Sequence, residues 1–305
     1  ALEILGVSEG DEVICQSLTF AASAFPINYL GASPIFIDSE ADTWNMDPVL
    51  LSNALADCRQ KGKLPKAIIA VHLYGMPYKV EAIQEVADQY GIPIIEDSAE
   101  ALGSSYKNRK CGTLGKFGIF SFNGNKIITT SAGGALVCKS KEHKEESIKR
   151  ATQAKEDCTH YEHKAIGYNY RLSNVLAGIG RGQIKVLADH INTKRAIFDQ
   201  YYQSLHETFD FQLEDKERFS NRWLTCILTR SAQERDKIHT FLSQHNIDAR
   251  PLWKPLHLQP VFRNAKAYTN GVAADLFDRG LCLPSGAGQN AEVTNSIIQL
   301  IRENL

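Results

Sequence analysis

The sequence predicts an α/β protein with a mostly parallel central sheet and a smaller C-terminal α/β domain. Two observations lead to this fold class. Between residues 11 and 136, short apolar β-branched runs alternate with stretches of helical period, which is the pattern of successive βαβ units. Runs such as AIIAV at 67–71 are apolar at every position, as expected of strands that helices cover on both faces of a sheet.

The first half of the chain supplies the predicted parallel sheet. Its strands are short apolar runs, and its helices space their apolar residues three or four positions apart. The predicted strands cover residues 12–15, 34–37, 67–71, 93–96, 118–122 and 135–138. The predicted helices between them cover residues 21–30, 48–58 and 80–90.

After residue 139 the sequence becomes more charged. The charge run at 139–150 predicts a solvent-facing helix, and residues 173 to about 206 predict one long helix, or a pair, between two lobes. A strand at 222–228, a helix at 233–245 and a terminal helix at 292–303 then form a second α/β segment. We therefore expect a large domain over residues 1–190 and a small C-terminal domain over residues 191–305.

Composition excludes several classes of protein. The 305 residues carry 34 Lys and Arg against 35 Asp and Glu, a net charge of -1 at pH 7, so we expect no nucleic acid partner. No run of about 18 apolar residues is present, so we expect no membrane partner. Neither a Walker A motif nor a GxGxxG after the first strand occurs, which removes the nucleotide-binding classes that depend on them.

The cysteines and histidines do not form a metal-binding pattern. Seven cysteines lie far apart with no CxxC pair, which favours reduced thiols and a cytoplasmic location over disulfides or a zinc site. The segment HYEH at 160–163 offers metal-binding side chain types, but the charged residues around it indicate a solvated polar segment. We therefore expect no metal.

Two residues at predicted strand ends are the strongest candidates for chemistry. Asp97 follows the apolar run at 94–95, and Lys126 follows the strand at 118–122 in a glycine-bearing loop. Ligands of open parallel sheets bind at the carboxyl ends of strands. Taken singly, Asp97 also suits a helix N-cap and Lys126 a surface position. Together they suit pyridoxal phosphate chemistry, in which a carboxylate keeps the pyridine nitrogen protonated and an amine bonds the cofactor.

Eight segments in order along most of the chain resemble the DegT/DnrJ/EryC1/StrS family of sugar aminotransferases. The segments are GDEVI (10–14), TF (19–20), GASP (31–34), HLYG (72–75), ED (96–97), SFNGNK (121–126), GYNYRLSN (167–174) and GRGQ (180–183). The resemblance implies the aspartate aminotransferase-like fold, fold type I of the pyridoxal phosphate-dependent transferases. It also implies that the large domain binds pyridoxal 5'-phosphate.

The resemblance implies roles for the matching residues. Lys126 bonds the cofactor and then moves the proton, and Asp97 pairs with the pyridinium nitrogen. Glu100 lies near the phenolic oxygen, where family members more often have an amide. Phe20 stacks on the pyridine ring, with a core aromatic as the alternative. Ser121 binds the cofactor phosphate.

The resemblance also implies residues that bind the cofactor of the neighbouring subunit and residues that bind the substrates. Asn169 reaches the phosphate in the neighbouring subunit, which predicts a homodimer with shared active sites. Arg171 binds a donor carboxylate or forms a structural ion pair. Arg250 and His257, in the segment RPLWKPLH at 250–257, bind the nucleotide sugar or belong to a loop that packs the lobes together.

The implied reaction transfers the amine of glutamate, which becomes 2-oxoglutarate, to a nucleotide-linked 4-keto-6-deoxy sugar. SFNGNK and GYNYRLSN are most similar to members that make UDP-4-amino-4,6-dideoxy-N-acetylglucosamine for glycan or glycoprotein assembly. The alternatives are a sugar dehydratase, which has His in place of the lysine, and a cofactor-binding or regulatory homologue without turnover. Lys126 argues against the first, and the retention of Asp97, Ser121 and Lys126 argues against the second.

One family feature has no match in the sequence. Family members bind the cofactor phosphate largely through a turn of small residues and Thr at the start of a helix. In the relatives this turn lies upstream of the position of Ala1. We therefore expect that the sequence lacks its N-terminal segment, or else that the protein binds the cofactor poorly.

Overall fold

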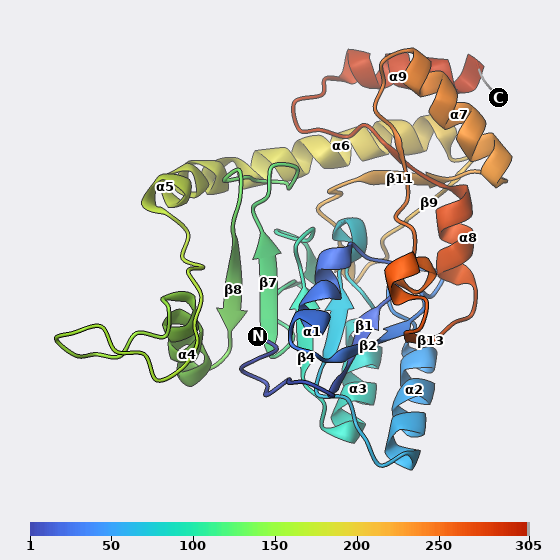
Figure 1. Ribbon diagram of the computed structural model, residues 1–305. Helices are drawn as coiled ribbons and strands as arrows, with labels where there is room; N and C mark the ends of the chain where they lie inside the picture. Colours follow the sequence, from blue (N-terminus) through green and yellow to red (C-terminus); the bar gives the residue numbers. More distant parts are fainter. Residues whose placement is uncertain (304–305) are drawn as a thin grey trace.

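The computed structural model describes residues 1–303, and a seven-stranded sheet forms its centre (Figure 1). The strands are β1 (Glu12–Gln16), β2 (Ser33–Ile37), β3 (Ile68–Val71), β4 (Ile94–Asp97), β7 (Phe117–Ser121), β8 (Gly134–Cys138) and β13 (Lys266–Tyr268). Their order is β13-β2-β1-β3-β4-β7-β8, and only β8 runs antiparallel to its neighbour. The predicted mostly parallel sheet is confirmed.

Side chains of the central strands alternate between two buried faces. On one face, the strands pack against α2 (Pro48–Gln60) and α3 (Val80–Tyr90) through a cluster that includes Ile14, Ile35, Ile68, Leu51 and Ile83. On the other face they pack against α1 (Phe25–Tyr29) through a cluster that includes Val13, Phe36, Ile69, Ile27 and Phe262. Burial on both faces explains why these strands are apolar at successive positions.

Local capping sets the helix boundaries in the first half. Asp47 accepts hydrogen bonds from the backbone N–H groups of Val49 and Leu50, so α2 begins at Pro48 as predicted. The predicted helix over 21–30 is divided into a 3-10 turn, η1 (Ala21–Ser23), and α1. Pro26 lies in the first turn of α1, where a missing N–H group is tolerated, and this accounts for the new start.

The predicted helices of the middle segment are confirmed. The charge run forms α4 (Lys141–Ala151), which has no buried residue. Residues 173–206 form α5 (Asn174–Gln183), the turn η3 (Ile184–Val186) and α6 (Leu187–Leu205). Figure 1 shows α5 and α6, drawn yellow-green to yellow, running across the top of the central sheet, whereas α4 lies beside the opposite end of β8.

The chain after α6 forms a second sheet of four strands. It contains β9 (Asp210–Phe211), β11 (Thr225–Leu228), β12 (Arg250–Pro251) and β14 (Gly280–Leu283), in the order β12-β14-β11-β9. The helices of this segment are α7 (Ala232–Gln244), α8 (Val272–Arg279) and α9 (Ala291–Glu303). Its core includes Phe198, Tyr201, Ile227, Leu281 and Ile297. The predicted strand at 222–228 is shorter, because β11 begins only at Thr225 and Trp223 and Leu224 pack instead in a cluster with residues of the first half of the chain.

Two connections join the halves. β13 comes from the C-terminal part of the chain but pairs with β2 in the central sheet, and β10 (Arg218–Phe219) pairs with β5 (Ser105–Tyr106), which also pairs with β6 (Arg109–Lys110). A core cluster between the halves includes Leu18, Tyr74, Trp223, Leu252 and Leu276. The domain boundary at residues 190 and 191 remains a prediction. Within residues 1–303, no helix combines the length and the apolar character needed to cross a membrane.

Candidate active site

The parallel strands bring four chain segments to one edge of the central sheet. β1, β3, β4 and β7 run in the same direction, so the segments that follow Gln16, Val71, Asp97 and Ser121 meet at their carboxyl ends. In Figure 1 the arrowhead of β7 points toward the helical span of α5 and α6. Ligands of such sheets bind at this edge.

Asp97 ends β4 at this edge and is held by two hydrogen bonds. The hydroxyl of Ser23 donates to Oδ2 over 2.6 Å, and the backbone N–H of Ala99 donates to Oδ1 over 3.1 Å. Thr19 Oγ1 lies 2.8 Å from Ser23 Oγ and extends the network toward β1. No helix begins between residues 98 and 104, so the helix-cap interpretation of Asp97 is wrong.

Lys126 and Glu100 meet, although they come from different loops. The Nζ atom of Lys126 lies 3.8 Å from Oε1 of Glu100. The other carboxylate oxygen accepts a hydrogen bond of 2.6 Å from the backbone N–H of Tyr74. Burial raises the pKa of Glu100 to about 7, although the Lys126 ammonium and the Tyr74 N–H both favour the ionised form. Glu100 therefore changes charge near neutral pH.

Aromatic side chains surround this pair, and the sequence analysis gave a role only to Phe20. The Nζ atom of Lys126 lies 4.2 Å from the centre of the Trp223 ring, an arrangement that attracts an ammonium group. The ring centres of Tyr74 and Phe20 lie 5.1 Å and 5.7 Å from that of Trp253. Phe20 is 59% exposed, so it is not a core aromatic.

Tyr74 and Ser23 are site residues that the sequence analysis missed. Tyr74 has a φ of 56°, in the left-handed region, and this conformation turns its N–H toward Glu100. Its hydroxyl accepts a hydrogen bond of 3.1 Å from the backbone N–H of Trp253. The segment HLYG at 72–75 was a signal for Tyr74, whereas Ser23 lay inside a predicted helix and gave none.

Ser121 and His257 lie at the same sheet edge. Ser121 is the last residue of β7, and its hydroxyl accepts a hydrogen bond of 3.3 Å from the backbone N–H of Asn123. Nδ1 of His257 lies 2.6 Å from the hydroxyl of Ser17, the first residue after β1. Partial burial lowers the pKa of His257 and favours the neutral ring.

Three predicted site residues do not join this group within the described chain. Asn169 and Arg171 are exposed on the segment between α4 and α5, and Asn169 accepts a hydrogen bond of 2.9 Å from Gln153. Arg171 has no ion pair with any residue in 1–303. Arg250 is exposed and binds Asp248, with 2.8 Å between Nη2 and Oδ2.

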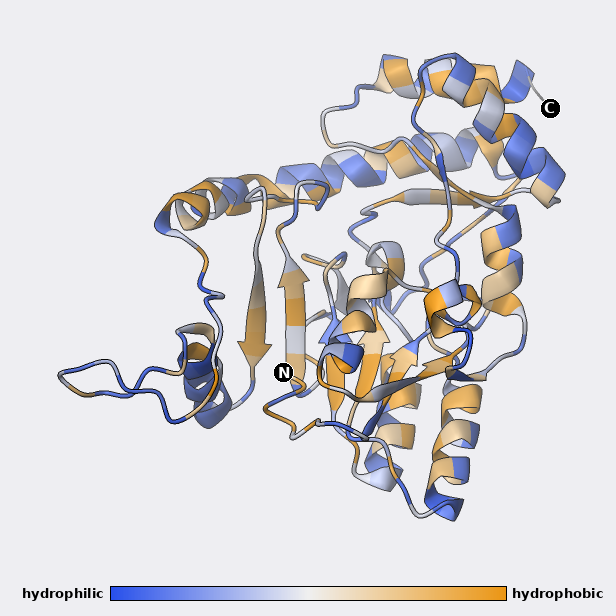
Figure 2. Cartoon of the chain, viewed as in Figure 1, coloured by the Kyte–Doolittle hydropathy of each residue, from blue (hydrophilic) through white to orange (hydrophobic). Residues whose placement is uncertain are grey.

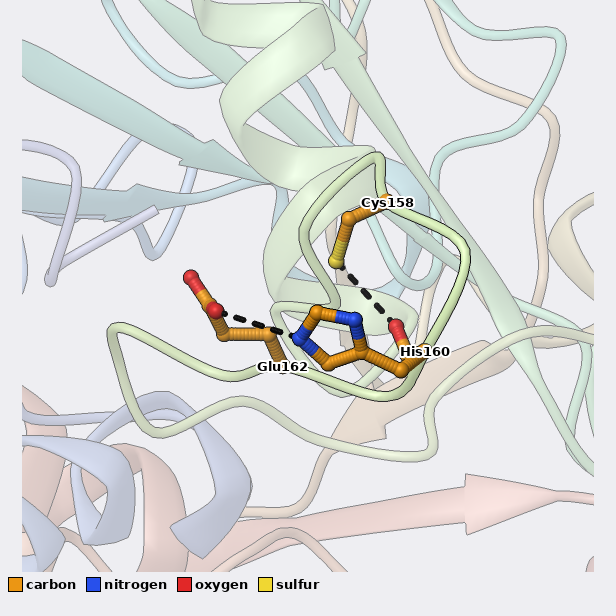
Figure 3. A group of neighbouring side chains, drawn as sticks. All are labelled: Cys158, His160 and Glu162. Atoms are coloured by element: carbon orange, nitrogen blue, oxygen red, sulfur yellow. Dashed lines mark hydrogen bonds and ion pairs between the residues drawn. The ribbon is translucent and has the colours of Figure 1, made fainter.

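The polar segment at 158–163 has a group of three side chains at the surface, of which Cys158 and His160 are exposed and Glu162 is half-buried (Figure 3). Cys158, His160 and Glu162 place one sulfur, nitrogen or oxygen atom each within 4.8 Å of one another. Nε2 of His160 lies 3.4 Å from Glu162, and the Cys158 thiol bonds the carbonyl of His160 over 3.1 Å. The expectation of no metal stays a prediction.

Comparison with known proteins tests the family resemblance. A model of the DegT/DnrJ/EryC1/StrS aminotransferase family matches residues 1–302. EpsN of Bacillus subtilis, whose name describes a pyridoxal phosphate-dependent aminotransferase, is 48% identical over 99% of this chain and 79% of its own length. The GDP-perosamine synthase of Escherichia coli O157:H7 is 40% identical over 99% of this chain and 81% of its own.

Solved structures agree with this assignment. A family aminotransferase from Brucella abortus superposes with a TM-score of 0.93 at 29% identity, covering 99% of this chain and 81% of that chain. The PMP form of a protein described as a sugar aminotransferase, from Streptococcus pneumoniae, has a TM-score of 0.92 at 25% identity, covering 99% and 83% of the two chains. The predicted aminotransferase fold is confirmed. The chain belongs to the DegT/DnrJ/EryC1/StrS aminotransferase family.

Proposed function

We propose that the protein is a pyridoxal phosphate-dependent sugar aminotransferase that moves the amine of glutamate to a nucleotide-linked 4-keto-6-deoxy sugar. The observation that carries the proposal is the position of Lys126. Its amine lies beside Glu100, and both follow strands of the sheet edge where Asp97 ends β4. A Lys and an Asp at neighbouring strand ends are the groups that this chemistry requires.

The residues at this edge fit pyridoxal phosphate. Lys126 offers an amine, Asp97 a carboxylate for the pyridinium nitrogen, and Ser121 a hydroxyl for the phosphate. Phe20 has most of its ring exposed and is therefore free to stack on the cofactor. When bound, the cofactor supplies a carbonyl group that takes up amines and a ring that withdraws electrons from the reacting carbon.

The chain's own groups do the work around the cofactor. Ser23 and the N–H of Ala99 bind both oxygens of Asp97, which keeps this carboxylate fixed at the end of β4. Lys126 is the group that moves the proton at the reacting carbon, because its amine lies beside Glu100 at this edge and its side chain is only 12% exposed. Glu100 accepts or donates a hydrogen bond depending on pH, since its pKa is about 7.

We infer that the sugar carrier is a uridine diphosphate. The support is the similarity of the SFNGNK and GYNYRLSN segments to family members that use uridine diphosphate sugars, which is an argument by family analogy. A guanosine diphosphate sugar is the second candidate, because relatives at 40% and 33% identity are named GDP-perosamine synthase. Arg171, Arg250 and His257 are the residues that we expect to bind donor and sugar nucleotide.

A homodimer with shared active sites is part of the proposal. Asn169 is exposed and binds Gln153 rather than a residue at the sheet edge, and neighbouring apolar residues face solvent. Figure 2 shows hydrophobic residues along β8 and α5. The exposed residues of this apolar surface are Leu136, Ile166, Tyr170, Val175, Ile179 and Ile184. Monomers rarely expose such surfaces, and a two-fold partner would cover the same residues in both copies.

A paired substrate assay tests the proposal. Purified protein with added pyridoxal phosphate and glutamate is given either UDP-4-keto-6-deoxy-N-acetylglucosamine or GDP-4-keto-6-deoxymannose. Mass spectrometry then follows the aminated sugar, and a coupled assay follows 2-oxoglutarate. We expect both products with the uridine sugar and at least tenfold slower turnover with the guanosine sugar. The reverse ratio would overturn the carrier assignment, and loss of the sugar's 3-hydroxyl without amination would indicate a dehydratase.

A further inference from the structure

Trp223 makes two separate contacts with the loop that carries Lys126. Its ring centre lies 4.2 Å from Nζ of Lys126, and its indole N–H donates a hydrogen bond of 2.9 Å to the carbonyl of Asn125. The side chain is 3% exposed. One indole therefore fixes both the amine and the backbone next to it.

The backbone of Trp223 is held on both sides. Its N–H donates to Oδ1 of Asn221 over 2.9 Å, and its carbonyl accepts from Nζ of Lys194 over 3.0 Å. The side-chain amide of Asn221 donates to the carbonyls of Glu100 and Leu102 over 2.8 Å and 3.0 Å. The Trp223 backbone is therefore tied to the loop of Glu100, the other partner of Lys126.

Lys194 is a buried ammonium group with carbonyl partners. It lies on α6, is 6% exposed, and donates to the carbonyls of Trp223 and Ser285 over 3.0 Å and 2.6 Å. No carboxylate within residues 1–303 pairs with it. Burial lowers the pKa of Lys194 to about 8, so the group is retained despite a desolvation cost. The buried ammonium joins two segments of the chain, because it bonds the carbonyls of both Trp223 and Ser285.

We propose that Trp223 is a positioning residue that holds the amine of Lys126 in place, and that Lys194 holds Trp223. This inference rests on the proposed role of Lys126. The indole limits the directions that the amine can take, because its ring face contacts the amine and its N–H holds the carbonyl of Asn125 in the same loop. The small domain thereby sets the geometry of a group that lies on the large domain. Neither Trp223 nor Lys194 takes part in bond making.

Amine labelling of cofactor-free protein tests the inference without relying on the proposed reaction. The rate at which a small amine-reactive ester modifies Lys126 is read by peptide mass spectrometry in Trp223→Leu, Trp223→Phe and Lys194→Met. We expect about threefold or faster labelling in Trp223→Leu, because the ring no longer covers or attracts the ammonium. Trp223→Phe keeps the ring face and should label at nearly the wild-type rate. The labelling rate of Lys126 in Lys194→Met should approach the rate in Trp223→Leu. The double variant should label no faster than Trp223→Leu.

A matched core variant separates positioning from general loosening. Leu281→Ala opens the buried core of the small domain, and Leu281 belongs to a different cluster from Trp223. It should lower the melting temperature and leave Lys126 labelling unchanged. Wild-type labelling in both Trp223→Leu and Lys194→Met, or equal acceleration in Leu281→Ala, would overturn the inference. If Trp223→Leu does not fold, the labelling rate of Lys194→Met decides.

Kinetics of the loaded enzyme give a second readout. Trp223→Phe loses the hydrogen bond to Asn125, so kcat should fall about tenfold while KM for glutamate changes less than twofold. The visible circular dichroism of the bound cofactor should change in the same variant, because it reports the geometry at Lys126. An unchanged kcat and an unchanged spectrum would contradict the positioning role. Absence of turnover in the wild type would count against the proposed function and leave the labelling result to decide this inference.

Discussion

The amine of Lys126 lies 3.8 Å from a carboxylate oxygen of Glu100, and the two side chains are only 12% and 4% exposed. Glu100 belongs to the loop after β4, and Lys126 to the loop after β7. The parallel pairing of these strands is therefore what brings the two groups together. Of the two groups, Glu100 has a pKa near neutral pH, so its titration can be measured.

The raised pKa of Glu100 predicts a stability that decreases as pH rises. The pKa is about 7 in the folded protein, against an ordinary value of 4.5, and burial is the main cause. Between these two values the folded state binds more protons than the unfolded chain, so the free energy of unfolding falls as pH increases. The contribution is fully present below pH 4.5 and amounts to about 3 kcal/mol. Glu100→Gln should remove this part of the slope.

Urea unfolding between pH 4.5 and pH 8 measures the effect. The exposed Glu207→Gln serves as the control, because it removes a carboxylate without removing a buried one. We expect Glu207→Gln to keep the wild-type slope. Parallel curves for wild type and Glu100→Gln would show that folding does not raise the pKa of Glu100, and would contradict the prediction.

The bond from Ser23 to Asp97 predicts a graded loss of activity. Asp97→Asn removes the charge that is proposed to face the cofactor nitrogen and should lower kcat/KM by roughly 10² to 10⁴. Ser23→Ala only frees Asp97 to move, and we expect about a tenfold loss. Ser8→Ala removes a comparable hydroxyl-to-carboxylate bond, of 3.1 Å to Asp11, at the exposed amino end of β1. Steady-state assays should show wild-type activity in this control and a lower value in Ser23→Ala.

The exposed apolar surface of α5 predicts dimerisation. Val175→Glu and Ile179→Glu place a charge on this surface and should convert a dimer, about twice the chain mass of 33.9 kDa, into a monomer. Val49→Glu is the control, since Val49 is 66% exposed on α2 and Val175 is 74% exposed. Light scattering measures the mass. A wild-type monomer at all concentrations, or a dimer in the Val175→Glu and Ile179→Glu variants, would refute this surface as the interface.

Gly75 is predicted to be required for the contact between the two halves. Its φ is 93°, and a Cβ there would overlap the side-chain oxygen of Asn221. Gly75→Ala should lower the free energy of unfolding by about 3 kcal/mol, because strain and overpacking add. Gly288→Ala meets no atom within 4 Å and has no left-handed φ, so its stability should stay within about 0.5 kcal/mol of the wild type. Equal unfolding midpoints in denaturant for the two variants would contradict this account.

The central sheet was predictable because its strands carry local signals. Residues 67–71 are apolar throughout, and the structure places 68–71 in the middle of the sheet, buried on both faces. β13 was missed because Lys266–Tyr268 is a short, half-polar edge strand that pairs with β2, more than 200 residues earlier. Pairing over such a separation leaves no periodic mark in the sequence.

The site was predictable only where motifs carry it. Asp97, Glu100 and Lys126 were found through strand ends and family resemblance, whereas Trp223 lies almost 100 residues from Lys126 along the chain. A single tryptophan inside the strand predicted at 222–228 indicates burial and nothing more. Its contact with the amine depends on how the C-terminal part of the chain packs on the first half, which no local pattern specifies.

Identifying the lysine that bonds the cofactor tests the central claim most directly. The protein is incubated with pyridoxal phosphate, reduced with borohydride, digested and mapped by mass spectrometry. We predict one modified peptide, which contains Lys126, and none in Lys126→Ala. Modification of the buried Lys194, or of many surface lysines to similar extents, would contradict the account.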